Sequence, residues 1–156
     1  MLFYRLVNPL HDQPGEWLAG TGGLFGSARW HSKGQRIVYL APTKANAVVE
    51  MACQDSQLAS YVLIEVEIPD AVAREAVEVS TLPLNWRSRA AYSACQKIGS
   101  DWHTASRTAL LVVPSAPVAG DFNILVNPLH ADAARLTAKR IGTFPMDSRL
   151  ITSNFR

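Results

Sequence analysis

The sequence is poor in cysteine and shows no metal-binding pattern. Its 156 residues include only Cys53 and Cys95, with no CxxC or Cys/His spacing of the kind that holds zinc. Two isolated thiols of this kind are expected to be small buried side chains, which favours a reducing compartment and argues against a disulfide scaffold. We therefore expect no metal.

Long hydrophobic runs are also missing. No apolar run reaches the roughly 18 residues that a membrane span requires. The N-terminal stretch MLFYRLVNPLHDQPG lacks the basic segment and the apolar segment of a signal peptide. The sequence therefore predicts a soluble, cytoplasmic protein with no membrane partner.

The chain has little excess charge of either sign. The 15 Lys and Arg residues are scattered among 13 Asp and Glu residues, so the net charge is only +2. Because there is neither a dense basic run nor a stripe of basic and aromatic residues, a direct nucleic-acid partner is disfavoured. The hydrophobic fraction of 48% is typical of a globular chain with one buried core.

The most informative stretch is RIVYLAPTKANAVVE, residues 36–50. It predicts a short strand at residues 37–41, a turn at the proline, and a helix at residues 44–57 that carries Glu50. Before it lies a glycine-rich loop, residues 20–34, that contains Arg29. A loop arginine, Tyr39 at the strand and a helix glutamate favour a site for an anionic nucleotide.

The remaining elements indicate an α+β fold, because strands far apart in sequence have no repeating βαβ order. Gly99 is expected to cap the helix that precedes it, and Asp101 to begin another helix. Further strands are predicted at residues 2–7, 62–68, 76–79, 109–113 and 124–127, and further helices at residues 90–97, from 101, and at 131–138.

Arg5 lies on the first predicted strand, on the same face as Phe3 and Val7. Two interpretations remain open from the residues alone. Arg5 is either a solvated arginine on an edge strand or a guanidinium at the rim of a cleft.

Short pieces along the chain resemble, in order and spacing, the RES domain. They are Tyr4-Arg5, GSARW at 26–30, IVYLA at 37–41, Glu50, LPLNW at 82–86, Gly99 with Trp102, VPSA at 113–116, Asn123 and NPLH at 127–130. This family is named for an Arg, a Glu and a Ser, and forms the toxin half of RES/Xre toxin–antitoxin pairs. The sequence departs from the common pattern at His31 and at Ser27-Ala28.

The resemblance implies a single RES domain over residues 1–156, with mixed or antiparallel sheets flanked by helices, as in ADP-ribosyltransferases of the diphtheria-toxin type. It implies an enzyme that consumes NAD as a glycohydrolase, as a phosphorylase, or by ADP-ribosylating a protein. It also implies an Xre-type helix-turn-helix antitoxin as partner, and we expect a homodimer.

Residue by residue, the resemblance assigns Arg5 and Arg29 to grip the cofactor and Tyr39 to lie beside the nicotinamide. Glu50 is the family glutamate and Ser115 the family serine. The predicted catalytic set is therefore Glu50 with Arg5, Tyr39 and Ser115, and the predicted NAD-binding set is Arg5, Arg29, Tyr39 and Ser115.

The chemistry of these residue types agrees with such roles. Cleavage of a nicotinamide–ribose bond passes through an oxocarbenium-like state, which a carboxylate such as Glu50 stabilises. Nicotinamide leaves as a neutral molecule, so no general acid is needed. Ser115 follows an apolar strand without a Gly-x-Ser-x-Gly elbow, which favours a hydrogen-bonding role over a nucleophilic one.

Each residue also has a structural interpretation. Without the family pattern, the simpler interpretation is that Tyr39 is a strand aromatic, Glu50 a solvated helix residue and Ser115 a turn hydroxyl. Three classes of function remain open: an NAD-consuming toxin, a module that binds NAD or ADP-ribose without turnover, and a nucleic-acid-directed toxin, which the low charge disfavours.

Overall fold

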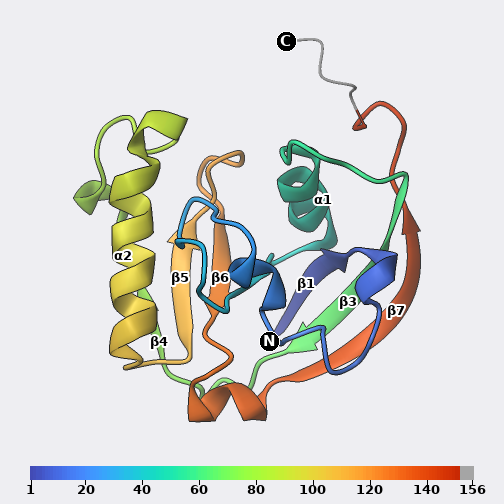
Figure 1. Ribbon diagram of the computed structural model, residues 1–156, viewed down its shortest axis with the longest axis horizontal. Helices are drawn as coiled ribbons and strands as arrows, with labels where there is room; N and C mark the ends of the chain where they lie inside the picture. The colour runs from blue at the N-terminus through green and yellow to red at the C-terminus, as the bar shows by residue number, and fades with distance from the viewer. Residues whose placement is uncertain (152–156) are drawn as a thin grey trace.

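A computed structural model describes residues 1–151 of the chain. Two β-sheets stand side by side, with helix α2 (Tyr92–Ala105) on the outer flank of one sheet and helix α1 (Lys44–Ala52) nearer the middle of the view, against the other sheet (Figure 1). The first sheet is antiparallel, in the order β1-β3-β7, and consists of β1 (Leu2–Val7), β3 (Ser60–Glu67) and β7 (Thr137–Pro145). The expected α+β class with largely antiparallel, nonlocal pairing is confirmed.

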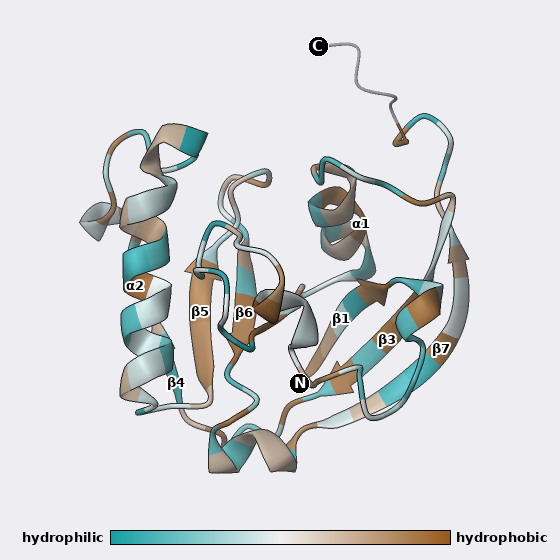
Figure 2. Ribbon diagram, viewed as in Figure 1, coloured by the Kyte–Doolittle hydropathy of each residue, from teal (hydrophilic) through white to brown (hydrophobic). Residues whose placement is uncertain are grey.

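The second sheet has the order β2-β6-β5-β4. Only the β4–β5 pair is parallel. Its strands are β2 (Val38–Leu40), β4 (Arg74–Ala76), β5 (Leu110–Pro114) and β6 (Phe122–Val126). Figure 2 shows β5 and β6 as largely hydrophobic, whereas β7 carries hydrophilic residues.

The main core lies between the two sheets. Alternate residues of β3 face it, and Ile64 and Val66 are completely buried there. They pack in one cluster with Leu110 and Ile124 of the second sheet. The packing of two apolar sheet faces therefore fixes β1 relative to β6, which places the helix after β2 close to the β5–β6 turn.

Helix α1 (Lys44–Ala52) packs against the first sheet through Ala47, and Thr43 caps it by accepting a hydrogen bond from the Asn46 amide. The prediction of a helix to residue 57 was wrong, because the side chain of Gln57 donates to the carbonyl of Ala52 and closes the helix there. As a result Cys53 is exposed, not buried as expected, while Cys95 is buried.

Helix α2 (Tyr92–Ala105) packs against the second sheet as one continuous helix. The prediction that Gly99 ends one helix and Asp101 begins another was wrong. A Cβ at Gly99 would lie 1.7 Å from the carbonyl oxygen of Trp30. The glycine is therefore required by the close approach of a neighbouring segment and does not cap the helix.

Two other expectations also need correction. The strand expected at residues 76–79 lies at β4, and Val79 instead begins a 3₁₀ helix. The helix expected at residues 131–138 is a short 3₁₀ helix followed by β7, a strand that the sequence did not predict because most of its side chains are exposed. The 3₁₀ helices are Pro9–His11, Thr21–Leu24, Val79–Thr81, Arg89–Ala91 and Ala131–Arg135.

Within residues 1–151, no helix is both long enough and apolar enough to cross a membrane.

Candidate active site

The candidate site is built around the carboxylate of Glu50, on the last full turn of α1. The hydroxyl of Ser115 donates a hydrogen bond to Glu50 Oε1 over 2.9 Å. The side-chain amide of Asn123 donates to the same oxygen over 2.5 Å. The structure thus brings together Glu50 and Ser115, which were predicted to share a site, and adds Asn123, to which the sequence had given no role.

A second contact fixes α1 on the β5–β6 turn. Asn46 lies one helical turn before Glu50 on the same face of the helix. Its amide donates to a carboxylate oxygen of Asp121 over 2.6 Å. The carbonyl of Asp121 in turn accepts the backbone amide of Ser115. The i, i+4 spacing of two polar residues was the sequence signal that would have placed Asn46 beside the site.

Ser115 is held from both sides. It is 1% exposed, and its hydroxyl oxygen accepts the backbone amide of Val118 over 3.2 Å while its proton points to Glu50. A hydroxyl whose proton is committed to a carboxylate acts as a hydrogen-bond donor that orients that carboxylate. The sequence had predicted a hydrogen bond from Ser115 to the cofactor, whereas in the structure its hydroxyl bonds Glu50 and the Val118 amide.

Tyr39 enters the site from β2, and its hydroxyl lies 2.8 Å from Nδ1 of His31. His31 Nε2 lies 3.0 Å from the carbonyl of Gly26. A carbonyl only accepts, so Nε2 carries the proton and Nδ1 accepts the tyrosine hydroxyl proton. His31, where the sequence departs from the family pattern, therefore fixes Tyr39.

Burial controls the protonation of this pair. Desolvation lowers the pKa of His31 and keeps the ring neutral. Desolvation also raises the pKa of Tyr39, and the negative charge of Glu50 raises it further, whereas a hydrogen bond from the Trp30 backbone and the charge of Arg29 oppose the increase. The Tyr39 hydroxyl is thus within reach of the fields of both Glu50 and Arg29.

Arg29 is anchored to main-chain carbonyls. Its guanidinium donates to the carbonyls of Trp86 over 2.5 Å and Arg87 over 2.9 Å, and it lies over the ring of Tyr92 at 4.5 Å. Carbonyls leave the positive charge unneutralised, and no carboxylate in the described part of the chain forms an ion pair with Arg29. Arg29 therefore connects the glycine-rich loop to the segment before α2 and keeps its full charge.

Arg5 is not hydrogen-bonded to the Glu50 cluster. Its guanidinium donates to the carbonyl of Trp17 over 2.5 Å, and its Nε atom is buried without a hydrogen-bond partner among residues 1–151. Desolvation lowers the pKa of Arg5 to about 10, so the side chain stays charged at neutral pH. Arg5 is a half-buried cation whose buried Nε–H group has no hydrogen-bond partner among residues 1–151.

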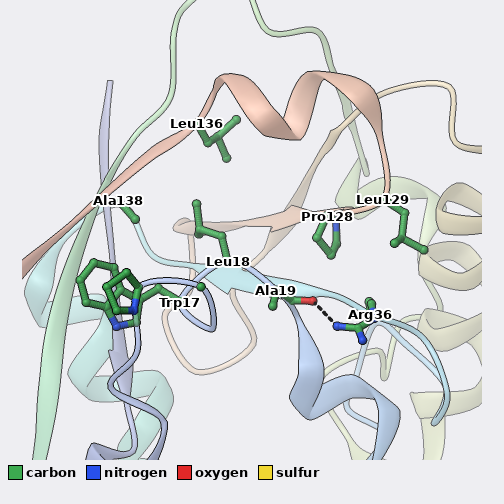
Figure 3. Close-up of a pocket in the computed structure, with 10 residues that line it drawn as sticks. Trp17, Leu18, Ala19, Arg36, Pro128, Leu129, Leu136 and Ala138 are labelled. Carbon is green, nitrogen blue, oxygen red and sulfur yellow. Dashed lines mark hydrogen bonds between the residues drawn. The ribbon is translucent and has the colours of Figure 1, made fainter.

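Two surface pockets were compared with the positions of the five predicted site residues. One pocket of about 470 Å³ lies around Trp17, Leu18 and Leu136, with Arg36 at one side bonded to the carbonyl of Ala19 (Figure 3). None of the five predicted site residues lines it. A second pocket of about 210 Å³ is lined by Ser115 and therefore adjoins the Glu50 cluster.

The free oxygen of the site is Glu50 Oε2. Both donors in the cluster bond Oε1, and no described residue donates to Oε2. A carboxylate fixed through one oxygen presents the other to a ligand, where it accepts a hydroxyl or stabilises a developing positive charge. Residues 1–151 contain no group of three His, Cys, Asp or Glu side chains arranged to hold a metal ion.

The fold is that of a known α+β class. Superposition on a chain of the M. tuberculosis MbcT–MbcA toxin–antitoxin complex gives a TM-score of 0.67 with 19% identity, over 90% of this chain and 84% of that chain. The family membership comes from the amino-acid sequence. The RES domain model matches residues 2–147, and the protein belongs to the RES domain family.

Two relatives illustrate the family. The chain is 35% identical over 156 residues to "Prs ADP-ribosylating toxin" of Sphingobium sp. (strain YBL2), covering 96% of each chain. It is 33% identical over 156 residues to "Toxin Res" of Photorhabdus laumondii subsp. laumondii, covering 97% of each. The family expectation from the short sequence pieces is confirmed.

Proposed function

We propose that this protein is the toxin of a bacterial toxin–antitoxin pair and that it cleaves the nicotinamide–ribose bond of NAD, as a glycohydrolase or phosphorylase. The observation that carries the proposal is the fixed carboxylate of Glu50, held by Ser115 and Asn123 with Oε2 free. The names of two similar proteins, "Toxin Res" and "Prs ADP-ribosylating toxin", support it.

In this proposal Glu50 stabilises the ribosyl cation. Oε2 accepts a ribose hydroxyl and becomes a better partner as positive charge develops at the anomeric carbon. Ser115 and Asn123 hold the carboxylate in place before the reaction, so little reorganisation is needed. A single preorganised group of this kind contributes about 3 to 4 kcal/mol to lowering the barrier.

The aromatic and cationic residues bind the rest of NAD. Since the Tyr39 hydroxyl is committed to His31, its ring face is the part available to stack on nicotinamide. Arg5 has no carboxylate partner among residues 1–151, so its charge is suited to the pyrophosphate, and Arg29 adds positive charge from its anchored position. We propose NAD as the substrate and no metal cofactor.

The main alternative is transfer of ADP-ribose to a protein. It is favoured by the name of the Sphingobium relative, "Prs ADP-ribosylating toxin". The same Glu50 geometry serves both reactions, because both pass through the same ribosyl cation and differ in the acceptor that attacks it. A module that binds NAD or ADP-ribose without turnover is a third possibility and requires only the arginines.

We further propose that residues 1–156 form one RES domain with an ADP-ribosyltransferase-like fold of the diphtheria-toxin type. We propose that the protein acts in the cytoplasm as a homodimer.

The proposed partner is an Xre-type helix-turn-helix antitoxin that inserts an acidic group near Arg5 and Arg29. Two charged guanidinium groups without carboxylate partners among residues 1–151 attract such a group.

The test is to incubate purified protein with NAD and to separate the products by chromatography. The proposal predicts release of nicotinamide together with ADP-ribose, or with ADP-ribose 1″-phosphate when phosphate is present. If nicotinamide is released only when a protein acceptor is added, and that protein gains ADP-ribose, the transferase is favoured. Binding of NAD without any nicotinamide release favours the non-catalytic module and contradicts the proposed function.

A further inference from the structure

We propose that Asn123 is a positioning residue for Glu50: it holds Oε1 so that Oε2 is the oxygen presented to the ligand. The catalytic meaning of this role rests on the function proposed above, whereas the contact itself does not. The role is not visible from the sequence because Asn123 and Glu50 are 73 positions apart and belong to different layers of the fold.

The first argument is geometric. The amide nitrogen of Asn123 lies 2.5 Å from Glu50 Oε1, and the Ser115 hydroxyl lies 2.9 Å from the same atom. Two donors on one oxygen remove the freedom of the carboxylate to rotate by exchanging its oxygens. Asn123 is 7% exposed and sits on a central strand of the second sheet, so it is itself well fixed.

The second argument comes from an unsatisfied atom. Asn123 Oδ1 is buried and has no hydrogen-bond partner among residues 1–151. A buried acceptor without a partner costs free energy, so a residue kept only for packing would be better apolar. The orientation is explained by Glu50, because only the nitrogen of the amide can donate to a carboxylate.

Asn127 provides a contrast four positions further along the chain. It is 1% exposed, its amide nitrogen donates to the carbonyl of His103, and its Oδ1 accepts the backbone amide of Leu129. Both ends of this side chain bond to main chain, as expected of a structural asparagine. The two residues therefore separate a role toward Glu50 from a role in the fold.

The experiment measures Asn123→Leu in the wild-type and in the Glu50→Ala background, with Asn127→Leu as the matched control. In the wild-type background, Asn123→Leu is expected to lower kcat about tenfold to thirtyfold and to change the Kd for NAD less than about twofold. In the Glu50→Ala background it should produce no further loss of kcat. In that background, where no Glu50 carboxylate is left to bond, its melting temperature should equal or exceed that of Glu50→Ala alone.

Asn127→Leu should behave in the opposite way. It leaves the His103 carbonyl and the Leu129 amide without partners, so its melting temperature should fall in both backgrounds, while kcat of the folded fraction stays within about twofold. If Asn123→Leu lowers kcat equally in both backgrounds, or lowers the melting temperature in both backgrounds as Asn127→Leu does, the positioning role is wrong.

A thermodynamic cycle keeps this inference separate from the proposed function. Urea unfolding of wild type, Glu50→Ala, Asn123→Leu and the double variant gives the coupling between the two side chains without any turnover. Non-additive unfolding free energies support the contact even if the wild type releases no nicotinamide, in which case only the proposed function fails. Additive free energies overturn the inference.

Discussion

The Ser115 hydroxyl lies 2.9 Å from Glu50 Oε1, although the two residues are 65 positions apart. One comes from a turn after β5 and the other from α1, and the packing of the two sheets brings these elements together. Both side chains are further restrained, Ser115 by Val118 and Glu50 by Asn123. The site is therefore preorganised before any ligand binds.

The first prediction concerns Ser115. Replacing it with alanine removes one of the two donors to Glu50 Oε1 but leaves Asn123 in place. We expect kcat to fall about tenfold and the free energy of unfolding to fall by about 1 kcal/mol, as for loss of one hydrogen bond. Steady-state kinetics and urea unfolding measure both. A loss of kcat near a millionfold would instead show that Ser115 is a nucleophile.

The second prediction concerns Arg29, which has both a structural and a binding role. Arg29→Ala leaves the carbonyls of Trp86 and Arg87 without their donor, so we expect the unfolding free energy to fall by about 1 to 3 kcal/mol. The Kd for NAD should rise as well.

Arg29→Lys is the informative control for that variant. A lysine retains the charge but cannot reproduce the planar fork that bonds two carbonyls and stacks on Tyr92. It should recover NAD affinity more than stability. If it recovers stability fully while NAD binding stays as weak as in Arg29→Ala, the charge of Arg29 is not what NAD requires.

The third prediction is a dependence of stability on pH. Burial lowers the pKa of His31 in the folded state, so the unfolded chain binds a proton first as the pH falls. Stability from the neutral ring is present above about pH 6.5, the ordinary value for histidine, and is lost as the pH falls below it. The limiting slope is about 1.4 kcal/mol per pH unit.

The measurement is urea unfolding of wild type and His31→Gln between about pH 7.5 and pH 5, where the unfolded histidine titrates. A glutamine side chain can contact Tyr39 and Gly26 but does not titrate. The difference between the two stability curves should therefore shrink as the pH falls. Parallel curves over this range would show that His31 does not contribute through its neutral form.

The sequence predicted the local elements around Glu50 better than the contacts between distant residues. The 37–50 stretch follows ordinary rules, since an apolar strand, a proline turn and a Thr-capped helix are all local signals. The Glu50–Ser115 pairing came only from the family resemblance, because no periodicity relates residues so far apart. Gly99 was misassigned because its reason is a backbone contact with Trp30, which is tertiary.

The hydrogen-bond partners of Arg5 and Arg29 could not be predicted from the neighbouring sequence either. Main-chain carbonyls hold Arg29, and the carbonyl of Trp17 holds Arg5. Carbonyl partners carry no side-chain signature in a sequence. His31 was treated as a departure from the family pattern, yet its two ring nitrogens connect Tyr39 to the glycine-rich loop. Only the folded structure reveals such a contact.

The most direct test of the account is the turnover of Glu50→Gln. This change keeps the shape of the side chain and removes its charge, so NAD should bind with a Kd within about threefold of wild type while nicotinamide release slows about a hundredfold or more. The matched control is Glu78→Gln, which removes an exposed carboxylate at the edge of a 3₁₀ helix and should leave turnover unchanged. Chromatography of nicotinamide, with calorimetric titration of NAD, measures both quantities. Slow release with intact binding is the predicted result, and release at the wild-type rate would contradict the central role of Glu50.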